Sequence, residues 1–281
     1  MIILGINAYH GDASAVLLRD GELIAAVEEE RFLRVKHWAG FPKESILACL
    51  EMAGVSPDEV DYFAVSRNPR AHLWRKAFFA LRHQPNPNLL LDRAKNSGQV
   101  WALPGKIAQV LGLNRAHVQQ RLHWVEHHPA HLASAFFVSP FEEAAVCAID
   151  GSGDFVSTSW GIGEGRTLNV HGRVYFPQSL GITYLALTQY LGFLRYGDEY
   201  KVMGLAPYGK PGHLEALRQI VQPKRAGGFE IDTSYLRRWS DLSMTWDNGE
   251  PQISPVYNQK LEKLLGPARQ PDDSLQPKHE S

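Results

Sequence analysis

The sequence contains little cysteine and no long hydrophobic run. Cys49 and Cys147 are the only cysteines in 281 residues. Both lie in apolar patterns, which predicts buried, reduced thiols rather than a disulfide framework, a redox pair or a ligand role. No segment approaches the roughly 20 apolar residues that a membrane-spanning helix needs. The chain begins on an apolar strand-like stretch without a basic region, so we expect no signal peptide and a cytoplasmic location.

Excess charge of either sign is also missing. The formal net charge is −1, so we expect neither nucleic acid nor a membrane as a partner. The sequence is 44% hydrophobic and 21% charged, as is typical of a globular protein. Its length predicts two lobes or one large domain.

Two stretches of the chain share one plan. Each contains an apolar strand ending in Asn7 or Asp150, a small-residue turn, an aspartate, two further strands and a helix. The first copy is expected to have strands at 2–7, 12–18 and 23–29, a helix at 42–53 and a strand at 58–65. The second is expected to have strands at 143–150, 155–163 and 167–175 and a helix at 179–194. This repeat predicts an α/β protein of two actin-like (ribonuclease H-like) mixed-sheet lobes with a cleft between the copies.

These copies set the expected domain boundaries. The first lobe covers 1–140 and carries a helical insertion at about 69–121, the second covers 141–265, and 266–281 is expected to be a disordered tail. Helices are expected at 103–111, 213–221 and 253–265. Several basic residues lie within the insertion or just before it. They would form either a face that binds a substrate or partner, or a solvated helix face. They are Arg67, Arg70, Arg75, Lys76 and Arg82.

His127 and His131 lie four residues apart at the start of a predicted helix. Residues at i and i+4 share a helix face, so both rings can converge on one ion. With Asp150 they form a donor set that suits iron, zinc or manganese, although helical histidines are also often only hydrogen-bonded structure. The residues that follow, Gly151, Ser152, Gly153 and Asp154, form an acidic glycine-rich turn that would present backbone amides to a phosphate.

Further candidates lie elsewhere in the chain. His10, in the turn of the first copy beside Asp12, is either a general base for a hydroxyl or a solvated turn residue. Lys36, in a basic cluster after the third strand, would hold a phosphate or mark an exposed strand end. Glu199 and Lys201 lie in a glycine-containing segment and are expected to face a cleft rather than solvent.

Three motifs in this order resemble those of the carbamoyltransferases of the nodulation and antibiotic-tailoring type. They are GINAYHGDASAVLLRDGELIAAVEEERFLRVKH, EHHPAHLASAFFVSPFEEAAVCAIDGSGD and GDEYKVMGLAPYG. The resemblance covers residues 1 to about 212. It implies an actin-like domain similar to the universal tRNA threonylcarbamoyl-adenosine protein, followed in family members by a YrdC-type domain.

The resemblance also implies a two-step reaction. Carbamoyl phosphate and ATP, with Mg²⁺, yield a carbamoyl-adenylate, and the actin-like domain transfers the carbamoyl group to a small-molecule hydroxyl beside Fe²⁺ or another divalent transition metal. By resemblance, His127, His131 and Asp150 match the metal ligands. His10 matches the histidine that activates the acceptor, and Lys36 matches a lysine near the nucleotide.

One departure from the family pattern affects what the chain is expected to do alone. Family members are about twice as long, and a further acidic metal ligand, the end of the second lobe and the YrdC-like domain have no counterpart here. The chain is therefore expected to be the acceptor- and metal-binding part of the enzyme, with an incomplete second lobe and a separate YrdC-like domain or subunit as partner. The alternatives are an inactive remnant or binding module of the same fold and, less favoured, an actin-like sugar kinase or ATPase.

Overall fold

The computed structural model describes residues 1–83, 96–225, 227–247, 250–276 and 279. The chain packs as two compact units, which are treated separately here. The first unit contains Met1–Ala71, Pro87–Ala130 and Thr245–Pro251, and the second contains His72–Asn86, His131–Met244 and Gln252–Ser281. The division falls within one helix, α7, rather than at residue 140, and α3 of the predicted insertion groups with the second unit.

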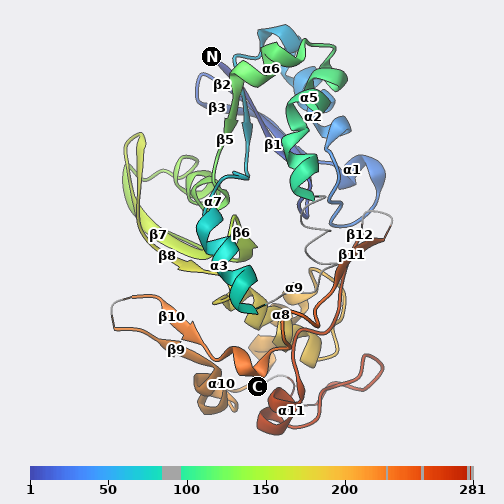
Figure 1. Cartoon of the computed structure of the whole chain (residues 1–281), viewed down its shortest axis with the longest axis vertical. Coiled ribbons are helices and arrows are strands. Elements are labelled where there is room, and N and C mark those ends of the chain that lie inside the picture. Colours follow the sequence, from blue (N-terminus) through green and yellow to red (C-terminus); the bar gives the residue numbers. More distant parts are fainter. Residues whose placement is uncertain (84–95, 226, 248–249, 277–278, 280–281) are drawn as a thin grey trace. The chain divides into compact units, whose positions relative to one another are not determined.

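The first unit is built on a five-stranded mixed sheet (Figure 1). Its strands are β1 (Ile2–Asn7), β2 (Ser14–Arg19), β3 (Glu22–Glu28), β4 (Tyr62–Val65) and β5 (Leu122–Trp124), in the order β3-β2-β1-β4-β5. β1, β2 and β3 form an antiparallel meander, and β4 and β5 continue the sheet parallel to β1. The hairpin between β2 and β3 has positive φ at Asp20 and Gly21, as two-residue hairpin loops require.

Amphipathic helices cover this sheet. α2 (Lys43–Ala53) buries Ile46, Cys49 and Leu50 against β2 and β3, and it ends at Gly54 in the left-handed conformation. α5 (Leu103–Leu111) buries Leu103, Ile107 and Leu111 at helical spacing. The smaller elements of this unit are α1 (Glu30–Leu33), η1 (Pro57–Glu59) and α6 (Arg115–Arg121). The core formed between sheet and helices fixes the strand ends that carry candidate site residues.

The second unit contains a three-stranded antiparallel sheet in the order β6-β7-β8. Its strands are β6 (Glu143–Gly153), β7 (Val156–Glu164) and β8 (Thr167–Tyr175). Leu132 and Phe136 of α7 (His127–Phe136) pack on Val146 and Ala148 of β6. The remaining elements are α3 (Leu73–His83), α8 (Leu180–Tyr190), α9 (Glu199–Leu205), η2 (Ala206–Tyr208), α10 (Leu214–Ile220), β9 (Val221–Pro223), β10 (Phe229–Ile231), η3 (Thr233–Tyr235) and α11 (Gln259–Leu265). β11 (Met244–Asp247) pairs with β12 (Glu250–Ile253), and the division between the two units falls within each of these strands.

The α/β class with a mixed sheet is confirmed, while several predicted boundaries are wrong. The strand expected at 58–65 begins only at Tyr62, because Ser56 and Glu59 form a capping box around η1. The helix expected at 253–265 is the end of β12 followed by α11, whose N-cap is Asn258. In the described part of the predicted tail, Arg269 donates to the carbonyl of Leu191 after α8 rather than extending into solvent.

The prediction for the cysteines is half right. Cys49 is buried in α2, whereas Cys147 is exposed on β6. An apolar strand pattern alone does not reveal that the side chains on one face of β6 are exposed among the described residues.

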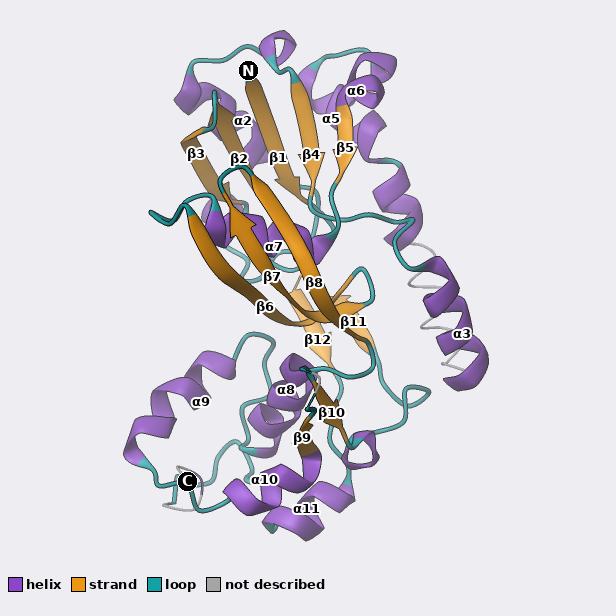
Figure 2. Ribbon diagram, turned by 90° about the vertical axis from the view of Figure 1, so that its left-hand side faces the viewer, coloured by secondary structure: helices purple, strands orange, loops and turns teal. Residues whose placement is uncertain are grey.

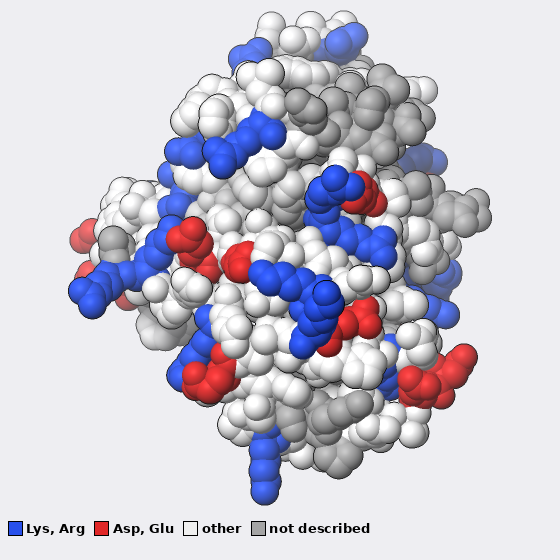
Figure 3. Space-filling view, turned by 60° about the horizontal axis from the view of Figure 1, so that its bottom comes forward, with Lys and Arg blue, Asp and Glu red and all other residues white. Residues whose placement is uncertain are grey.

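Charges of both signs are mixed on the surface. On the face in Figure 3, Lys and Arg side chains lie beside Asp and Glu side chains. Ion pairs between residues close in sequence, such as Arg238 with Asp241 at 3.2 Å, also place opposite charges side by side. No helix in the described ranges has the length and apolarity to cross a membrane.

Candidate metal centre

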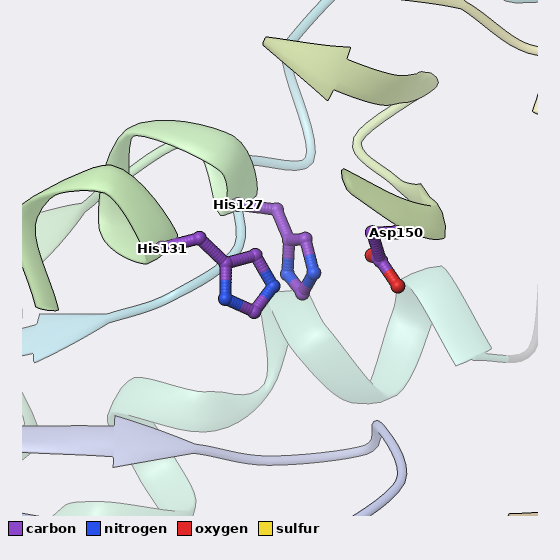
Figure 4. Close-up of side chains that lie close together, drawn as sticks. All are labelled: His127, His131 and Asp150. Atoms are coloured by element: carbon purple, nitrogen blue, oxygen red, sulfur yellow. The ribbon is translucent and has the colours of Figure 1, made fainter. Parts of the chain in front are cut away.

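His127, His131 and Asp150 bring their donor atoms together. One ligand atom from each lies within 4.8 Å of the other two. In Figure 4 the two imidazoles project from successive turns of α7, and the Asp150 carboxylate points toward them from β6. His127 is buried, His131 exposed and Asp150 half-buried, so the donors are reachable from solvent at one side.

The start of α7 places the first imidazole. The chain leaves β5, and the backbone N–H of Val125 donates to Val65 at the end of β4. His127 Nδ1 lies 3.4 Å from the Ser66 carbonyl oxygen. In the tautomer in which Nδ1 donates to that carbonyl, Nε2 carries the lone pair that a metal needs. Pro129 in the first turn of α7 suits a helix start.

The N-terminus of α8 holds the backbone of Asp150. The Ser179 hydroxyl donates to the carbonyls of Asp150, at 3.1 Å, and Gly151, at 2.7 Å, while its oxygen accepts from the N–H of Ile182. Gly181 allows the close approach, because a Cβ there would lie 2.6 Å from Asp150 and Gly151 backbone atoms. The position of Asp150 in the donor set thus depends on a contact between α8 and β6, and no local sequence motif encodes this contact.

Substituting Gly181 with alanine is expected to destabilise the protein by roughly 1–3 kcal/mol, because the new methyl group displaces the backbone at Asp150. The same shift should weaken divalent metal binding. Urea unfolding and a Zn²⁺ titration measure the two effects. Gly204→Ala is the matched control, since a Cβ at this glycine of α9 meets no atom within 4 Å. Equal stability of the two variants would contradict the steric argument.

His10 lies beside the first imidazole. The ring centroids of His10 and His127 are 5.0 Å apart. The turn that carries His10 is held by the Asn7 amide, which donates to the carbonyls of Gly11 and Asp12, and Tyr9 and Asp12 both have positive φ. Positive φ at two non-glycine residues is uncommon and often marks a functional turn. The structure therefore brings His10 beside His127, while its role as a base stays a prediction.

Asp12 and Lys36 have specific partners within the first unit. Asp12 Oδ1 lies 2.8 Å from His37 Nδ1, and Lys36 Nζ lies 2.7 Å from Glu30 Oε1. A surface depression of about 100 Å³ is lined by Glu30, Arg31, Arg34, Val35 and Lys36. The depression offers cationic groups to an anion, and the nucleotide-binding roles of Asp12 and Lys36 stay predictions.

Lys36→Met is expected to raise the pKa of the Glu30 carboxyl. The hydrogen bond from Lys36 is the largest cause that lowers this pKa, ahead of the backbone N–H of His37. A lowered folded-state pKa stabilises the fold above the ordinary pKa of the carboxyl, and this contribution is lost as the pH falls through the lowered value. Carboxyl titration by NMR measures the shift. Lys43→Met, which removes an exposed partner of Glu44, is the control and should leave Glu30 unchanged.

The glycine-rich turn predicted after Asp150 does not form there. β6 continues irregularly through Gly153, and the turn is Asp154-Phe155, with φ of 50° and 73°. The extended backbone follows from pairing between Gly153 and Val156, which overrides the local preference of the glycines. Phosphate binding by Gly151, Ser152, Gly153 and Asp154 stays a prediction.

The segment that carries Glu199 and Lys201 is helical rather than a glycine-rich loop. α9 spans Glu199–Leu205, preceded by the buried Asp198, which pairs with Lys201 at 2.6 Å. Burial and then the charge of Glu199 raise the pKa of Tyr184 on α8, so Glu199 lies near that phenol. The binding roles of Glu199 and Lys201 stay predictions.

Sequence reasoning missed the residues that support the site. Ser179, Gly181 and Asn7 anchor the backbone at Asp150 and at the His10 turn. Ser179 precedes an apolar helix pattern and could have been recognised as an N-cap. The hydrogen bonds from Ser179 to β6 could not have been recognised, because they join residues 28 and 29 positions apart in the sequence.

Comparison with known proteins places the chain beside one family and several bacterial and archaeal relatives. The family described as Carbamoyltransferase N-terminus matches residues 2–250. The Synechocystis sp. protein sll1178 is 38% identical over 97% of this chain and 44% of its own length. Nodulation protein NolNO of Sinorhizobium fredii is 41% identical over 80% of this chain and 32% of its own length. The chain thus spans less than half the length of either relative.

Among solved structures, YeaZ from Pseudomonas aeruginosa aligns with 63% of this chain and 68% of its own, at 18% identity and a TM-score of 0.34. A score of this size supports no argument about fold or function.

Proposed function

The chain belongs to the carbamoyltransferase N-terminus family, and from this premise we propose that it is the acceptor- and metal-binding part of an O-carbamoyltransferase. The donor group is a carbamoyl-adenylate made from carbamoyl phosphate and ATP, with Mg²⁺ accompanying ATP. The acceptor is a hydroxyl of a sugar or antibiotic-like small molecule. The observation that carries the proposal is the convergence of His127, His131 and Asp150 beside His10 in a member of this family.

The donor set fits a divalent transition metal such as Fe²⁺. Two imidazoles and one carboxylate suit iron, zinc or manganese, whereas Mg²⁺ prefers oxygen ligands. When bound, such an ion supplies positive charge that stabilises oxygen atoms gaining negative charge. His127, His131 and Asp150 would hold it, with Ser179 fixing the backbone of the carboxylate.

His10 is proposed to accept the proton of the acceptor hydroxyl. The hydroxyl oxygen forms a bond to the carbamoyl carbon, the bond from that carbon to the adenylate phosphate oxygen breaks, and AMP leaves with the electron pair. The proton passes from the hydroxyl to the imidazole of His10. The 5.0 Å between the His10 and His127 rings would keep this base beside the metal ligands.

The two antiparallel meanders, β1-β2-β3 and β6-β7-β8, support the proposal that the fold is a duplicated actin-like one. In each, the first strand leads into a turn that carries a candidate site residue, Asp12 or Asp154, and two antiparallel strands and a helix follow. The cleft between lobes, the cytoplasmic location and the separate YrdC-like partner belong to the same proposal. One alternative is a catalytically inactive remnant or binding module of the same fold. A sugar kinase is less favoured, because the Mg²⁺ that a kinase uses prefers oxygen ligands and needs no pair of histidines.

The test joins this chain in one fusion to the part of the Synechocystis protein outside the matched region. The fusion is assayed with radiolabelled carbamoyl phosphate, ATP and a panel of sugar and aminoglycoside hydroxyl acceptors. We expect acceptor-dependent AMP release and labelled product. His10→Ala should lower transfer by about 100-fold. His171→Ala, an exposed histidine of β8, should leave it unchanged. Label transfer that persists in His10→Ala would contradict the base assignment, and a fusion inactive with every acceptor would contradict the function.

A further inference from the structure

α3 packs against the second unit through one of its sides. Figure 2 shows this helix to the right of the β6-β7-β8 sheet. The ring centroid of Phe79 lies 5.7 Å from that of Phe155 and 5.0 Å from that of Phe176. One turn earlier in α3, the guanidinium carbon of Arg75 lies 3.8 Å from the ring centroid of Tyr175 at the end of β8. The side of α3 that carries Phe79 therefore faces its own unit.

The opposite side of α3 is apolar and exposed. Leu73, Trp74, Phe78 and Leu81 are 57%, 66%, 58% and 78% exposed, and Ala77 among them is exposed as well. Steps of three and four residues put these side chains on one face of a helix. An amphipathic helix ordinarily turns its apolar stripe toward the core, yet no residue of α3 is buried. The stripe of α3 is thus turned to the outside, and large exposed apolar patches mark sites that bind a protein or a membrane.

Cations border this stripe. At 3.6 residues per turn, Arg82 falls beside Phe78 on one border of the stripe, and Lys76 falls beside Leu73 on the other. The sequence contains no Asp or Glu from residue 62 to residue 91. The formal net charge of −1, on which the expectation of no membrane partner rests, averages over the whole chain and does not reflect this basic segment.

The combination of an apolar stripe with basic borders favours one kind of occupant. A second copy of the chain that packed through the same face would bring the cations of two α3 helices together, with no acidic residue in the segment to pair with them. An anionic bilayer offers negative head groups to the cations and an acyl region to the apolar side chains. Trp side chains such as that of Trp74 favour the boundary between these two layers.

We propose that α3 is an interfacial helix that binds an anionic membrane surface. The helix lies in the plane of the bilayer, with Trp74, Phe78 and Leu81 at the boundary of the acyl chains and with Lys76 and Arg82 at the level of the head groups. With 11 residues, α3 is long enough to lie on a membrane but not to cross one. The inference concerns attachment to a surface and does not rest on the proposed chemistry.

Co-sedimentation of the whole chain with lipid vesicles tests the proposal. We expect binding to vesicles that contain phosphatidylglycerol, and binding at least about tenfold weaker to vesicles of phosphatidylcholine alone. Leu81→Glu should weaken binding to the anionic vesicles by about tenfold or more, and Arg82→Gln by about fivefold. Met52→Glu, at a 65% exposed apolar residue of α2, is the matched control and should bind like the unchanged chain. Urea unfolding verifies that each variant is folded.

Four results would overturn the proposal. Two are the absence of vesicle binding by the folded chain and equal binding by Leu81→Glu and Met52→Glu. The third is self-association of the chain that Leu81→Glu abolishes, which would make a second copy the occupant. The fourth is a fusion to the Synechocystis segment that no longer binds vesicles and in which the α3 amides exchange more slowly, which would make a protein segment the occupant. Because none of these readouts is carbamoyl transfer, failure of the proposed function leaves them unchanged.

Discussion

Replacing His131 with alanine is expected to lower the affinity for Zn²⁺ and Fe²⁺ by at least about 100-fold, since even loss of a residue that supports a metal ligand costs 10- to 100-fold. His131 is the most informative member of the donor set because its ring is exposed, so its removal leaves no cavity in the core. His127 is buried, and its removal would change packing as well as coordination. Equilibrium dialysis against each metal gives the affinity directly.

The matched variants for this prediction keep the shape of the site. Asp150→Asn preserves volume and the bond to the Gly151 N–H but removes the negative charge, and should lower affinity as well. His171→Ala removes an exposed histidine from β8 and should leave affinity within error. If His131→Ala and His171→Ala bind Zn²⁺ equally, the three residues do not form a metal site.

The part of this site that could be predicted is the part encoded locally. The i, i+4 spacing of His127 and His131 predicts a shared helix face, and α7 forms over them. Asp150 could be placed because an apolar run precedes it, although β6 runs three residues further. The meander strands are predictable for the same reason, since alternation and the Asp20-Gly21 turn act over a few residues.

What could not be predicted depends on contacts distant in sequence. The extension of β6 to Gly153 follows from its pairing with β7, and the placement of Asp150 follows from Ser179 and Gly181 on α8. The exposure of Cys147 depends on whether another element packs on its face of β6. The sequence pattern of a strand is the same whether or not a helix covers that face. Such features need tertiary structure.

Glu29 shows how large a nonlocal effect can be, because it caps a helix that it does not belong to. It follows β3 and is 2% exposed. Its carboxylate accepts from the N–H groups of Glu44, at 3.0 Å, and Ser45, at 2.8 Å, and from the Ser45 hydroxyl, at 2.7 Å. These residues form the first turn of α2, whose own N-cap position, Pro42, supplies no side-chain cap. A negative charge at this helix end also interacts favourably with the helix dipole.

Glu29→Ala is therefore expected to destabilise the protein by roughly 2–4 kcal/mol, because three donors, two of them buried, lose a charged acceptor at once. Glu29→Gln keeps the volume and one acceptor oxygen and should have a smaller effect. Urea unfolding measures both. Amide exchange at Glu44 and Ser45 should accelerate in Glu29→Ala before the rest of α2 does, because the loss is local to its first turn.

Glu28→Ala is the matched control, since the neighbouring side chain is 46% exposed and its pair with Arg31 spans 3.5 Å. Its effect should stay within about 0.5 kcal/mol. Equal urea midpoints for the two alanine variants would show that the carboxylate does not hold α2. The Glu29 backbone N–H also donates to Ala13, next to Asp12, and Lys36 follows seven residues later. The carboxylate is therefore expected to hold the first turn of α2, while the backbone N–H, which Glu29→Ala keeps, holds the chain beside Asp12.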